Sequence, residues 1–160
     1  MTQDALRIRP FQPGDEEAFR TLNEAWIAGL FHIEPKDREV LGNPLRYIIE
    51  PGGEVFMALD AGRAVGCCAM IAMPDHCFEL AKMAVAEDQR GRGVGRQILN
   101  YSIDAMWCRG ARRIYLETSS KLPNAIHLYQ SIGFRPVPAE KLVPSPYQRA
   151  DVFLELFPGS

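Results

Sequence analysis

The stretch QRGRGVGRQIL, residues 89–99, places glycine at three alternate positions directly before a run with helical periodicity. Gly91, Gly93 and Gly95 give the backbone unusual freedom and allow a close approach to the main chain, at a cost in chain entropy. A hydrophobic core does not need this arrangement. We therefore expect a tight turn that enters a helix and holds something against bare main chain.

The physical chemistry of such a turn favours an anion. Successive main-chain N–H groups, together with the positive end of the following helix, form a concave site for a phosphate or pyrophosphate. The spacing matches neither the G-x-G-x-x-G of dinucleotide-binding folds nor the G-x-x-x-x-G-K-[ST] of the P-loop, which weakens both usual nucleotide-binding interpretations. A phosphorylated cofactor is the natural ligand, and a glycine-rich turn with a purely structural role stays open as the alternative.

Outward from this stretch, strand and helix patterns alternate along the chain. We expect strands at residues 5–11, 54–60, 64–73, 77–86, 112–119, 134–138 and 147–156, and helices at 14–30, within 31–53, from the glycines to about 110, and at 122–134. The three central strands predict an antiparallel meander. In the last strand, Val152, Leu154 and Leu156 share one face, with Tyr147, Arg149, Asp151 and Phe153 on the other. The fold class is α/β (α+β), with a mixed, mostly antiparallel sheet of about six to seven strands flanked by about four helices.

Composition bounds the possible functions. The 160 residues are 47% hydrophobic and 24% charged, which suits a single domain over residues 1–160. The formal net charge is −2 without blocks of like charge, so we expect no nucleic-acid partner. The four cysteines and three histidines have no metal-ligand spacing, and adjacent Cys67 and Cys68 in an apolar run suit a reducing cytosol, so we expect neither a metal nor disulfides. The N-terminus lacks an apolar signal region and no segment has membrane-spanning length, which predicts a cytoplasmic protein without a membrane partner.

Two segments carry a resemblance to a known family. The run ELAKMAVAEDQRGRGVGRQIL, residues 79–99, and the run NAIHLYQSIGF, residues 124–134, resemble the GNAT superfamily of acetyl-CoA-dependent N-acetyltransferases. The first is similar to the family's Q/R-x-x-G-x-G/A signature through Arg90, Gly93 and Gly95. The second is similar to its later segment through the following residues: Asn124, Ala125, Leu128, Tyr129, Gly133 and Phe134. The N-terminal third matches the family only in the order of its elements.

The resemblance implies a slot for acetyl-CoA between the fourth and fifth strands. The pyrophosphate would lie on main-chain amides of the following residues: Arg90, Gly91, Arg92, Gly93, Val94, Gly95 and Arg96. Main-chain groups near Met83 and Val85 would pair with the pantetheine arm as with an added strand, and the Asn124 side chain would contact it. The three arginines add charge there or are simply solvated, so their amides matter more than their guanidiniums.

Acetyl transfer requires a neutral amine, whereas an alkylamine with a pKa near 10 is almost fully protonated at neutral pH. Glu79 is the leading candidate for the base. Strand periodicity places Glu79, Ala81 and Met83 on one face, toward the reacting end of the slot. A simple surface carboxylate, or a partner of Lys82, is the alternative, and Glu117 on the next strand is the reserve candidate.

Tyr129 is the candidate for the group that donates a proton or hydrogen bond to the departing thiolate. It also belongs to the buried stripe of its helix, with Ala125, Leu128 and Ile132, so a role in core packing competes with the catalytic one. A phenol serves both if the ring is packed and the hydroxyl reaches the slot.

The acceptor is a primary amine, for which Trp26, Phe31 and Arg149 are the candidate binding residues. Arg149 would bind a carboxylate of an amino-acid-like acceptor, or else pair with Asp151 at the surface. The acidic residues Glu34, Asp37 and Glu39 would attract a polyamine or a protein lysine, or merely solvate a helix. A small amine or amino-acid-like compound is favoured over a protein lysine or N-terminus.

The sequence predicts direct attack of the amine in a ternary complex, without a cysteine nucleophile. A non-catalytic acyl-CoA sensor or interaction module is the alternative function. Monomer and homodimer both stay open.

Overall fold

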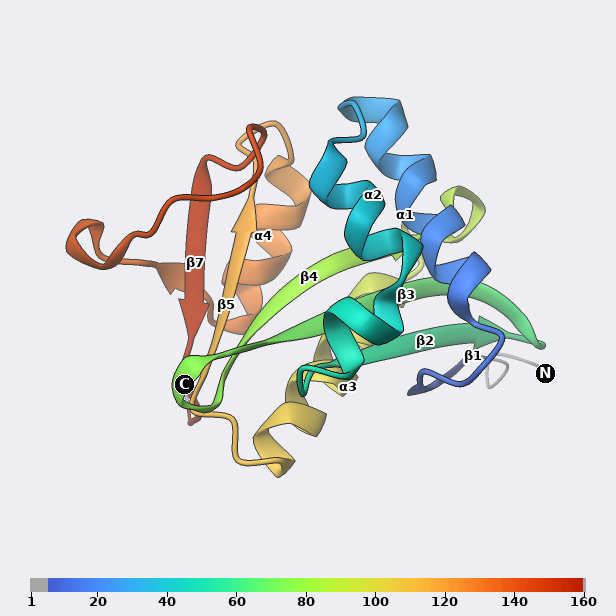
Figure 1. Ribbon diagram of the computed structural model, residues 1–160, viewed down its shortest axis with the longest axis horizontal. Helices are drawn as coiled ribbons and strands as arrows, with labels where there is room; N and C mark the ends of the chain where they lie inside the picture. Colours follow the sequence, from blue (N-terminus) through green and yellow to red (C-terminus); the bar gives the residue numbers. More distant parts are fainter. Residues whose placement is uncertain (1–5, 160) are drawn as a thin grey trace.

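The computed structural model describes residues 6–159 and contains one seven-stranded sheet in the order β1-β2-β3-β4-β5-β7-β6 (Figure 1). The strands are β1 (Leu6–Pro10), β2 (Glu54–Asp60), β3 (Arg63–Met73), β4 (Cys77–Val85), β5 (Arg113–Thr118), β6 (Arg135–Pro136) and β7 (Val152–Leu156). The helices are α1 (Glu16–Leu30), α2 (Pro35–Gly42), α3 (Val94–Cys108) and α4 (Pro123–Ile132). Short turns are η2 (Leu45–Ile49, a π-helix) and the 3₁₀ segments Pro74–His76, Glu87–Gln89 and Ala139–Lys141.

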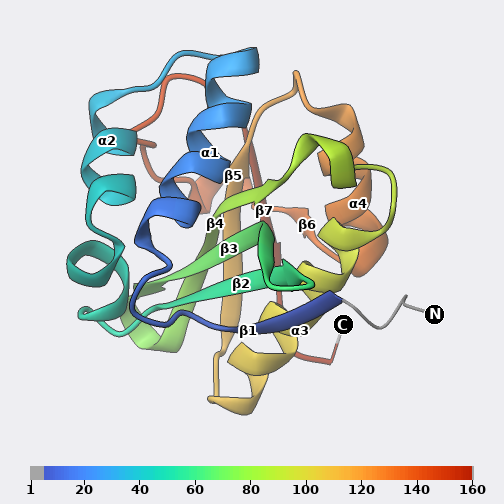
Figure 2. The ribbon, with the colours of Figure 1, turned by 90° about the vertical axis from the view of Figure 1, so that its right-hand side faces the viewer.

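Helices cover both faces of the sheet, with α1 and α2 on one side and α3 and α4 on the other (Figures 1 and 2). The apolar stripe of α3 packs against β2–β5, and Ile98, Leu99 and Met106 on that stripe are fully buried. A second cluster lies under α1 and α2 around Phe19, Ile27 and Met57. The predicted layered fold and the meander of β2, β3 and β4 are confirmed.

Most element boundaries agree with the sequence, and the differences of consequence lie in the region 31–53 and in the last strand. Residue 5 of the predicted first strand lies outside the described residues. The region 31–53 holds two helical segments, α2 and η2, where a single short helix is expected.

The last strand is shorter than predicted. It begins at Val152, and residues 147–151 form a turn in its place. Asp151 ends this turn: its N–H donates to Thr118 O, while its carboxylate accepts hydrogen bonds from the N–H and hydroxyl of Ser120. The alternating pattern at 147–151 therefore does not describe strand faces.

A bulge in β4 changes the face that its side chains take. The register between β3 and β4 shifts between Cys67 and Ala69, and Lys82 on the opposing strand has a φ of 52°. Before the bulge Leu80 packs with the α3 cluster, and beyond it Met83 does so as well. Glu79 and Met83 therefore lie on opposite faces, so the prediction that they share one is wrong, because the extra residue breaks the period of two.

The two parallel strands at the centre of the sheet separate before they end. β4 and β5 pair only from Cys77 with Arg113 to Leu80 with Leu116, although β4 continues to Val85. β4 remains paired with β3 over that extension. The side of β4 that faces β5 beyond Leu80 is thus left open for a pocket.

Candidate active site

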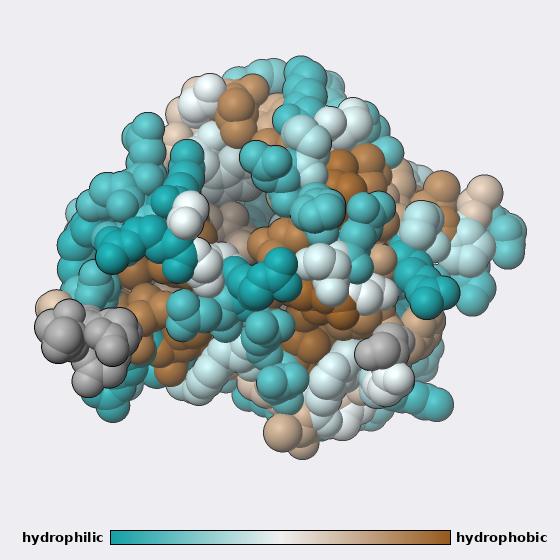
Figure 3. Space-filling model, turned by 180° about the vertical axis from the view of Figure 1, so that it is seen from behind, coloured by the Kyte–Doolittle hydropathy of each residue, from teal (hydrophilic) through white to brown (hydrophobic). Residues whose placement is uncertain are grey.

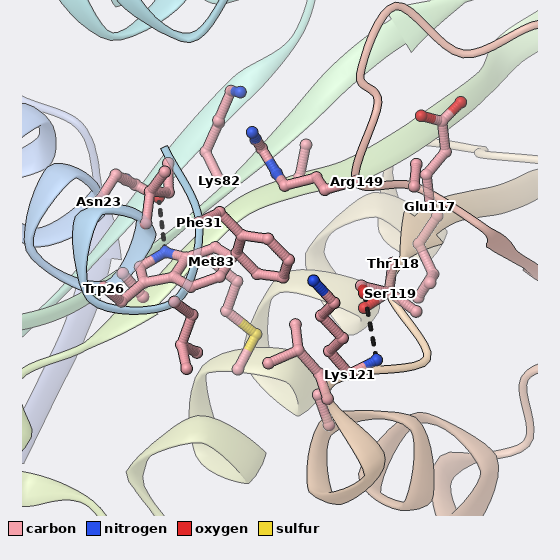
Figure 4. Close-up of a pocket in the computed structure, with 18 of the residues that line it drawn as sticks. Asn23, Trp26, Phe31, Lys82, Met83, Glu117, Thr118, Ser119, Lys121 and Arg149 are labelled. Carbon is pink, nitrogen blue, oxygen red and sulfur yellow. Dashed lines mark hydrogen bonds between the residues drawn. The ribbon is translucent and has the colours of Figure 1, made fainter. Parts of the chain in front are cut away.

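A pocket of about 410 Å³ opens where β4 and β5 separate. Its walls come from α1, β4, β5, the start of α4 and the turn at 147–150. The view from behind shows the surface hollowed between polar side chains, with apolar residues at its edges (Figure 3). Figure 4 shows side chains from both halves of the chain converging on this space. The structure therefore brings segments that are far apart in sequence to one site.

The glycine stretch forms the predicted turn into a helix. Gly91 and Gly93 have φ of 79° and 80°, a left-handed conformation that L side chains rarely adopt, and a Cβ at either would meet open space. The first helical hydrogen bond at this end runs from Gln97 N–H to Gly93 O. The amides of Val94, Gly95 and Arg96 therefore lack intrahelical acceptors, as expected at a helix N-terminus. This open, amide-rich turn fits a pyrophosphate.

Gly95 and the arginines of the stretch have other roles. A Cβ on Gly95 would lie 3.2 Å from the Met83 side chain, so this glycine permits close packing of α3 on β4. Arg90 lines the pocket and its Nε donates to Val85 O at 3.2 Å, which occupies one of the main-chain groups assigned to pantetheine. Arg96 donates to the Ser131 hydroxyl at 3.1 Å. The remaining loop arginine, Arg92, lies 3.5 Å from the Gln89 amide oxygen.

Met83 and Asn124 both line the pocket, at the open stretch of β4 and at the first turn of α4. An extended arm placed along β4 would find main chain that β5 does not pair. The residues present thus fit the acetyl-CoA slot that the resemblance implies.

Glu79 lies in the pocket on the face covered by α1 and α2. Burial and the neighbouring Glu117 carboxylate raise the pKa of Glu79 to about 7, against the opposing effect of the Lys82 ammonium. Among the described residues, no side chain donates a hydrogen bond to this carboxylate. A partly buried carboxyl that exchanges its proton near neutral pH suits a general base.

Glu117, the reserve candidate, is held by two donors. Tyr115 Oη donates to one carboxylate oxygen at 2.9 Å, and Ser145 Oγ donates to the other at 2.6 Å. These hydrogen bonds occupy both oxygens of the Glu117 carboxylate, whereas the Glu79 carboxylate has no such donor among the described residues. Of the two acids, Glu79 is the better placed to take a proton.

Tyr129 lines the pocket from α4, and its ring packs edge-on against Phe134 with centroids 5.9 Å apart. Burial raises its pKa well above the usual value, so the hydroxyl is protonated at neutral pH. No described side chain or main-chain group hydrogen-bonds this hydroxyl. The ring is part of the core while the hydroxyl is available as a donor, which combines the two roles set out from the sequence.

The end of the pocket next to α1 carries an aromatic wall. Trp26, near the end of α1, and Phe31, directly after it, form an edge-to-face pair with centroids 6.2 Å apart (Figure 4). Trp26 Nε1 donates to Asn23 Oδ1 at 3.4 Å. Lys121 lies across the cleft with its Nζ 5.7 Å from the Phe31 ring centre. Trp26 and Phe31 both line the pocket, as the sequence predicts.

Arg149 also lines the pocket, but its partners differ from both sequence interpretations. It binds Asp37 with two hydrogen bonds, of 2.7 and 2.9 Å, and reaches Glu34 at 3.3 Å. Asp151 is engaged with Ser120 instead. The guanidinium holds carboxylates of its own chain, so surface pairing with Asp151 is wrong, whereas binding of an acceptor's carboxylate by Arg149 stays a prediction.

Sequence reasoning did not foresee the contact that Lys82 makes with Asp37 and Tyr147 at the pocket. Lys82 Nζ lies 3.1 Å from Asp37 Oδ1 and 2.6 Å from the Tyr147 hydroxyl. The Asp37 side chain is 0% exposed, so the view of this residue as solvating a helix is wrong. The available signal was a lysine inside the otherwise apolar run of β4, which needs a buried partner.

The adjacent thiols of Cys67 and Cys68 are not activated as nucleophiles. Cys67 and Cys68 are buried, and burial raises the pKa of Cys68 to about 12 and that of Cys67 further. Both thiols are therefore protonated at neutral pH. Within residues 6–159 no group of three or more His, Cys, Asp and Glu side chains is arranged to hold a metal ion. No helix in the same range combines the length and apolarity needed to cross a membrane.

Comparison with known proteins gives further evidence for the resemblance to the GNAT superfamily. The model of the Acetyltransferase (GNAT) family matches residues 14–134. N-alpha-acetyltransferase 30 of Schizosaccharomyces pombe is 33% identical over 96 residues, which cover 56% of this chain and 63% of that protein. Streptothricin acetyltransferase of Streptomyces lavendulae is 24% identical over 151 residues, covering 79% and 80% of the two chains. The chain thus spans less than two thirds of the first of these relatives.

Solved structures share the fold. The crystal structure of an acetyltransferase of the GNAT family from Staphylococcus aureus superposes with a TM-score of 0.84 at 22% identity, covering 94% of this chain and 98% of the other. A similarity at this level of identity concerns the fold, whereas the family match covers most of the chain. The chain belongs to the GNAT family of acetyltransferases.

Proposed function

We propose that the protein is an N-acetyltransferase that moves the acetyl group of acetyl-CoA to a primary amine by direct attack in a ternary complex. The observation that carries the proposal is the Glu79 carboxyl, which lies without a hydrogen-bond donor among the described residues in the pocket between β4 and β5 and has a pKa of about 7. Family membership supplies the reaction class.

Each part of the pocket has a separate task. Acetyl-CoA, when bound, supplies an activated acetyl thioester. The amides that follow Gly93 hold its pyrophosphate, and Asn124 and the open main chain near Met83 orient its arm. Glu79 accepts a proton from the acceptor ammonium, directly or through a water, to produce the nucleophilic amine. The Tyr129 hydroxyl donates a hydrogen bond or a proton to the leaving sulfur.

The pocket supports a small amine with an apolar body as the acceptor. Trp26 and Phe31 offer aromatic surface on one side, and Glu79 lies deeper between β4 and β5. Arg149 lines the pocket with its guanidinium already bound to Asp37 and Glu34 of its own chain. These features favour an amine recognised by aromatic contact over one recognised by a carboxylate at Arg149.

The test is incubation of the protein with acetyl-CoA, a thiol reagent and a panel of acceptors, scored by product mass. The panel contains aromatic and aliphatic monoamines, a polyamine, amino acids and a lysine-bearing peptide. We expect CoA release that depends on the amine, with an acetylated product of the aromatic or aliphatic monoamines. Binding of acetyl-CoA without turnover on any acceptor would instead support the non-catalytic sensor.

A further inference from the structure

A buried ion cluster lies beside the Glu79 carboxyl and has no part in the chemistry described above. At its centre, the Asp37 carboxylate binds Lys82 at 3.1 Å and Arg149 at 2.7 Å. The exposed fractions of these side chains are 0% for Asp37, 6% for Lys82 and 14% for Arg149. The Glu34 N–H also donates to Asp37 Oδ2 at 2.9 Å, which fixes the carboxylate at the N-terminus of α2. Because these groups hold the Asp37 carboxylate by charge-assisted hydrogen bonds, it is a fixed part of the site.

The bulge in β4 turns Lys82 toward this cluster. With its positive φ, Lys82 extends from the strand to α2, on the same side of the sheet as Glu79. Its ammonium also donates to the Tyr147 hydroxyl at 2.6 Å and lies 4.4 Å from the centre of that ring. If Asp37 did not hold it, Glu79 would be the nearby carboxylate on the same strand. A salt bridge between the two would keep Glu79 ionised.

The titratable and charged side chains around Glu79 come from four segments. They are Lys82 on β4, Tyr115 and Glu117 on β5, Glu34 and Asp37 at the start of α2, and Tyr147 and Arg149 in the turn before β7. Both cations of this set are bound by α2 carboxylates. Glu117 accepts hydrogen bonds from Tyr115 and Ser145, which hold its carboxylate in place, and its charge raises the pKa of Glu79. The net charge around Glu79 therefore depends on Asp37.

We propose that Asp37 is a positioning residue for the base: it holds the Lys82 ammonium and the Arg149 guanidinium on α2 and, together with Glu34, neutralises them, so that the Glu79 carboxyl remains free to take a proton. The inference rests on the proposed function in that it takes Glu79 as the base. Asp37 itself does not touch the acceptor or the acetyl donor. It acts through Lys82 and Arg149.

The experiment follows the Glu79 carboxyl directly. Carbon-13 NMR of glutamate-labelled protein, with the Glu79 signal assigned by its loss in Glu79→Gln, gives the titration midpoint, and kcat/KM is measured over the same pH range. Asp37→Asn is expected to lower the Glu79 midpoint by about one pH unit or more, since an uncompensated cation within 4–6 Å has an effect of this size. The acid limb of kcat/KM should move to lower pH by the same amount.

Two further variants test whether the effect passes through Lys82. Lys82→Met alone keeps the pair between Asp37 and Arg149 and should raise the midpoint by well under one pH unit, because Lys82 lowers the pKa of Glu79 only partly when Asp37 holds it. In the double variant Asp37→Asn with Lys82→Met, the midpoint should return most of the way to that of the parent protein. Glu39→Gln is the matched control, because Glu39 is another acid on α2 that is half exposed and pairs only with Lys36 among the described residues.

An unchanged midpoint in folded Asp37→Asn would overturn the proposal, and so would a double variant that shifts as far as Asp37→Asn. If Asp37→Asn does not fold, Lys82→Met decides: a rise of one unit or more would show that Lys82 acts on Glu79 without compensation, against the proposal. Full turnover of Glu79→Gln would remove Glu79 as the base and thus contradict the proposed function. The NMR titration would still test the effect of Asp37 on the carboxyl.

Discussion

Glu79 lies where two influences oppose its ionisation and one favours it. Burial and the Glu117 carboxylate raise its pKa, the Lys82 ammonium lowers it, and the result is about 7. A carboxyl in ordinary solvent would be ionised and weakly basic at neutral pH. The environment therefore supplies a stronger base than the residue type alone would. Glu79 therefore gains or loses its proton near neutral pH.

Replacement of Glu79 by glutamine keeps the size and polarity but removes the proton acceptor. We expect turnover to fall by roughly a hundredfold or more with little change in acetyl-CoA affinity. In the parent protein kcat/KM should decrease as the pH falls through about 7, because protonation of Glu79 removes the base, and the variant should lack this limb. Initial rates between pH 5.5 and 9 give both quantities.

Glu117→Gln serves as the comparison for this prediction. It removes a negative charge that raises the pKa of Glu79, so the acid limb should move to lower pH and persist. Loss of the limb in Glu117→Gln, together with its retention in Glu79→Gln, would assign the base to Glu117.

Tyr129→Phe separates chemistry from packing at a single residue. The ring contact with Phe134 is retained, and the hydroxyl that is lost has no hydrogen-bond partner among the described residues. We expect the catalytic rate to fall by roughly tenfold to a thousandfold, while Tm and acetyl-CoA binding stay nearly unchanged. Poor acceptors should be affected more than good ones. A full rate combined with a lower Tm would indicate a structural hydroxyl instead.

At the scale of elements, regular patterns in the sequence predicted the strands and helices, whereas local interruptions of these patterns were missed. Strand alternation and the helix that follows the glycine stretch were visible because each follows a regular period or residues with special backbone freedom. The bulge at Lys82 was not visible, since neither a glycine nor a proline marks it. One extra residue there moved Met83 to the other face from Glu79. The turn at 147–151 was hidden by an alternation that resembles a strand.

The glycine turn gives a test at this scale. Gly93→Asp places a side chain and a negative charge at the start of α3, where a diphosphate would lie, so acetyl-CoA binding should be lost in a folded domain. Gly93→Ala is the matched control: it carries the same backbone strain at φ 80° without the charge, and its Cβ meets open space. We expect weakened binding in the alanine variant and none in the aspartate variant, measured by calorimetry. Unchanged affinity in folded Gly93→Asp would remove the phosphate site from the mechanism.

At the scale of the whole molecule, the pocket joins segments that no local pattern connects. The motifs at 79–99 and 124–134 follow a family signature and predicted an acetyl-CoA site, and residues of both segments line the pocket. The candidate acceptor residues Trp26 and Phe31 were predicted only from the order of elements. The cluster of Asp37, Lys82 and Arg149 spans more than a hundred residues of sequence. Such a contact depends on the packing of α2 over the sheet.

The same cluster predicts how the stability of the molecule depends on pH. The pKa of Asp37 falls from its ordinary value of 3.8 to about 2, chiefly because hydrogen bonds from Arg149 and the Glu34 N–H, together with the Lys82 charge, outweigh burial. A lowered pKa in the folded state means that the contribution is present above about pH 4 and is lost as the pH falls through about 2. Its size is about 2 kcal/mol. Glu79 acts in the opposite direction: its raised pKa stabilises the fold below about 4.5, and this contribution is lost as the pH rises through about 7.

We therefore expect the free energy of unfolding to decline on both sides of pH 4 to 5 through these two residues. Urea unfolding followed by circular dichroism between pH 2 and 8 measures it, provided that the transition is two-state. In Glu79→Gln, the free energy of unfolding should decline less between pH 4.5 and 7 than in the parent protein. Its decline below pH 4 should be unchanged. Asp37→Asn should be less stable by about 3–5 kcal/mol at neutral pH, because two buried cations lose their partner, and should lose less stability than the parent between pH 4 and 2. A parent-like acid slope in Asp37→Asn would mean that other carboxylates govern unfolding there, and that the buried cluster contributes to the pocket without anchoring the fold.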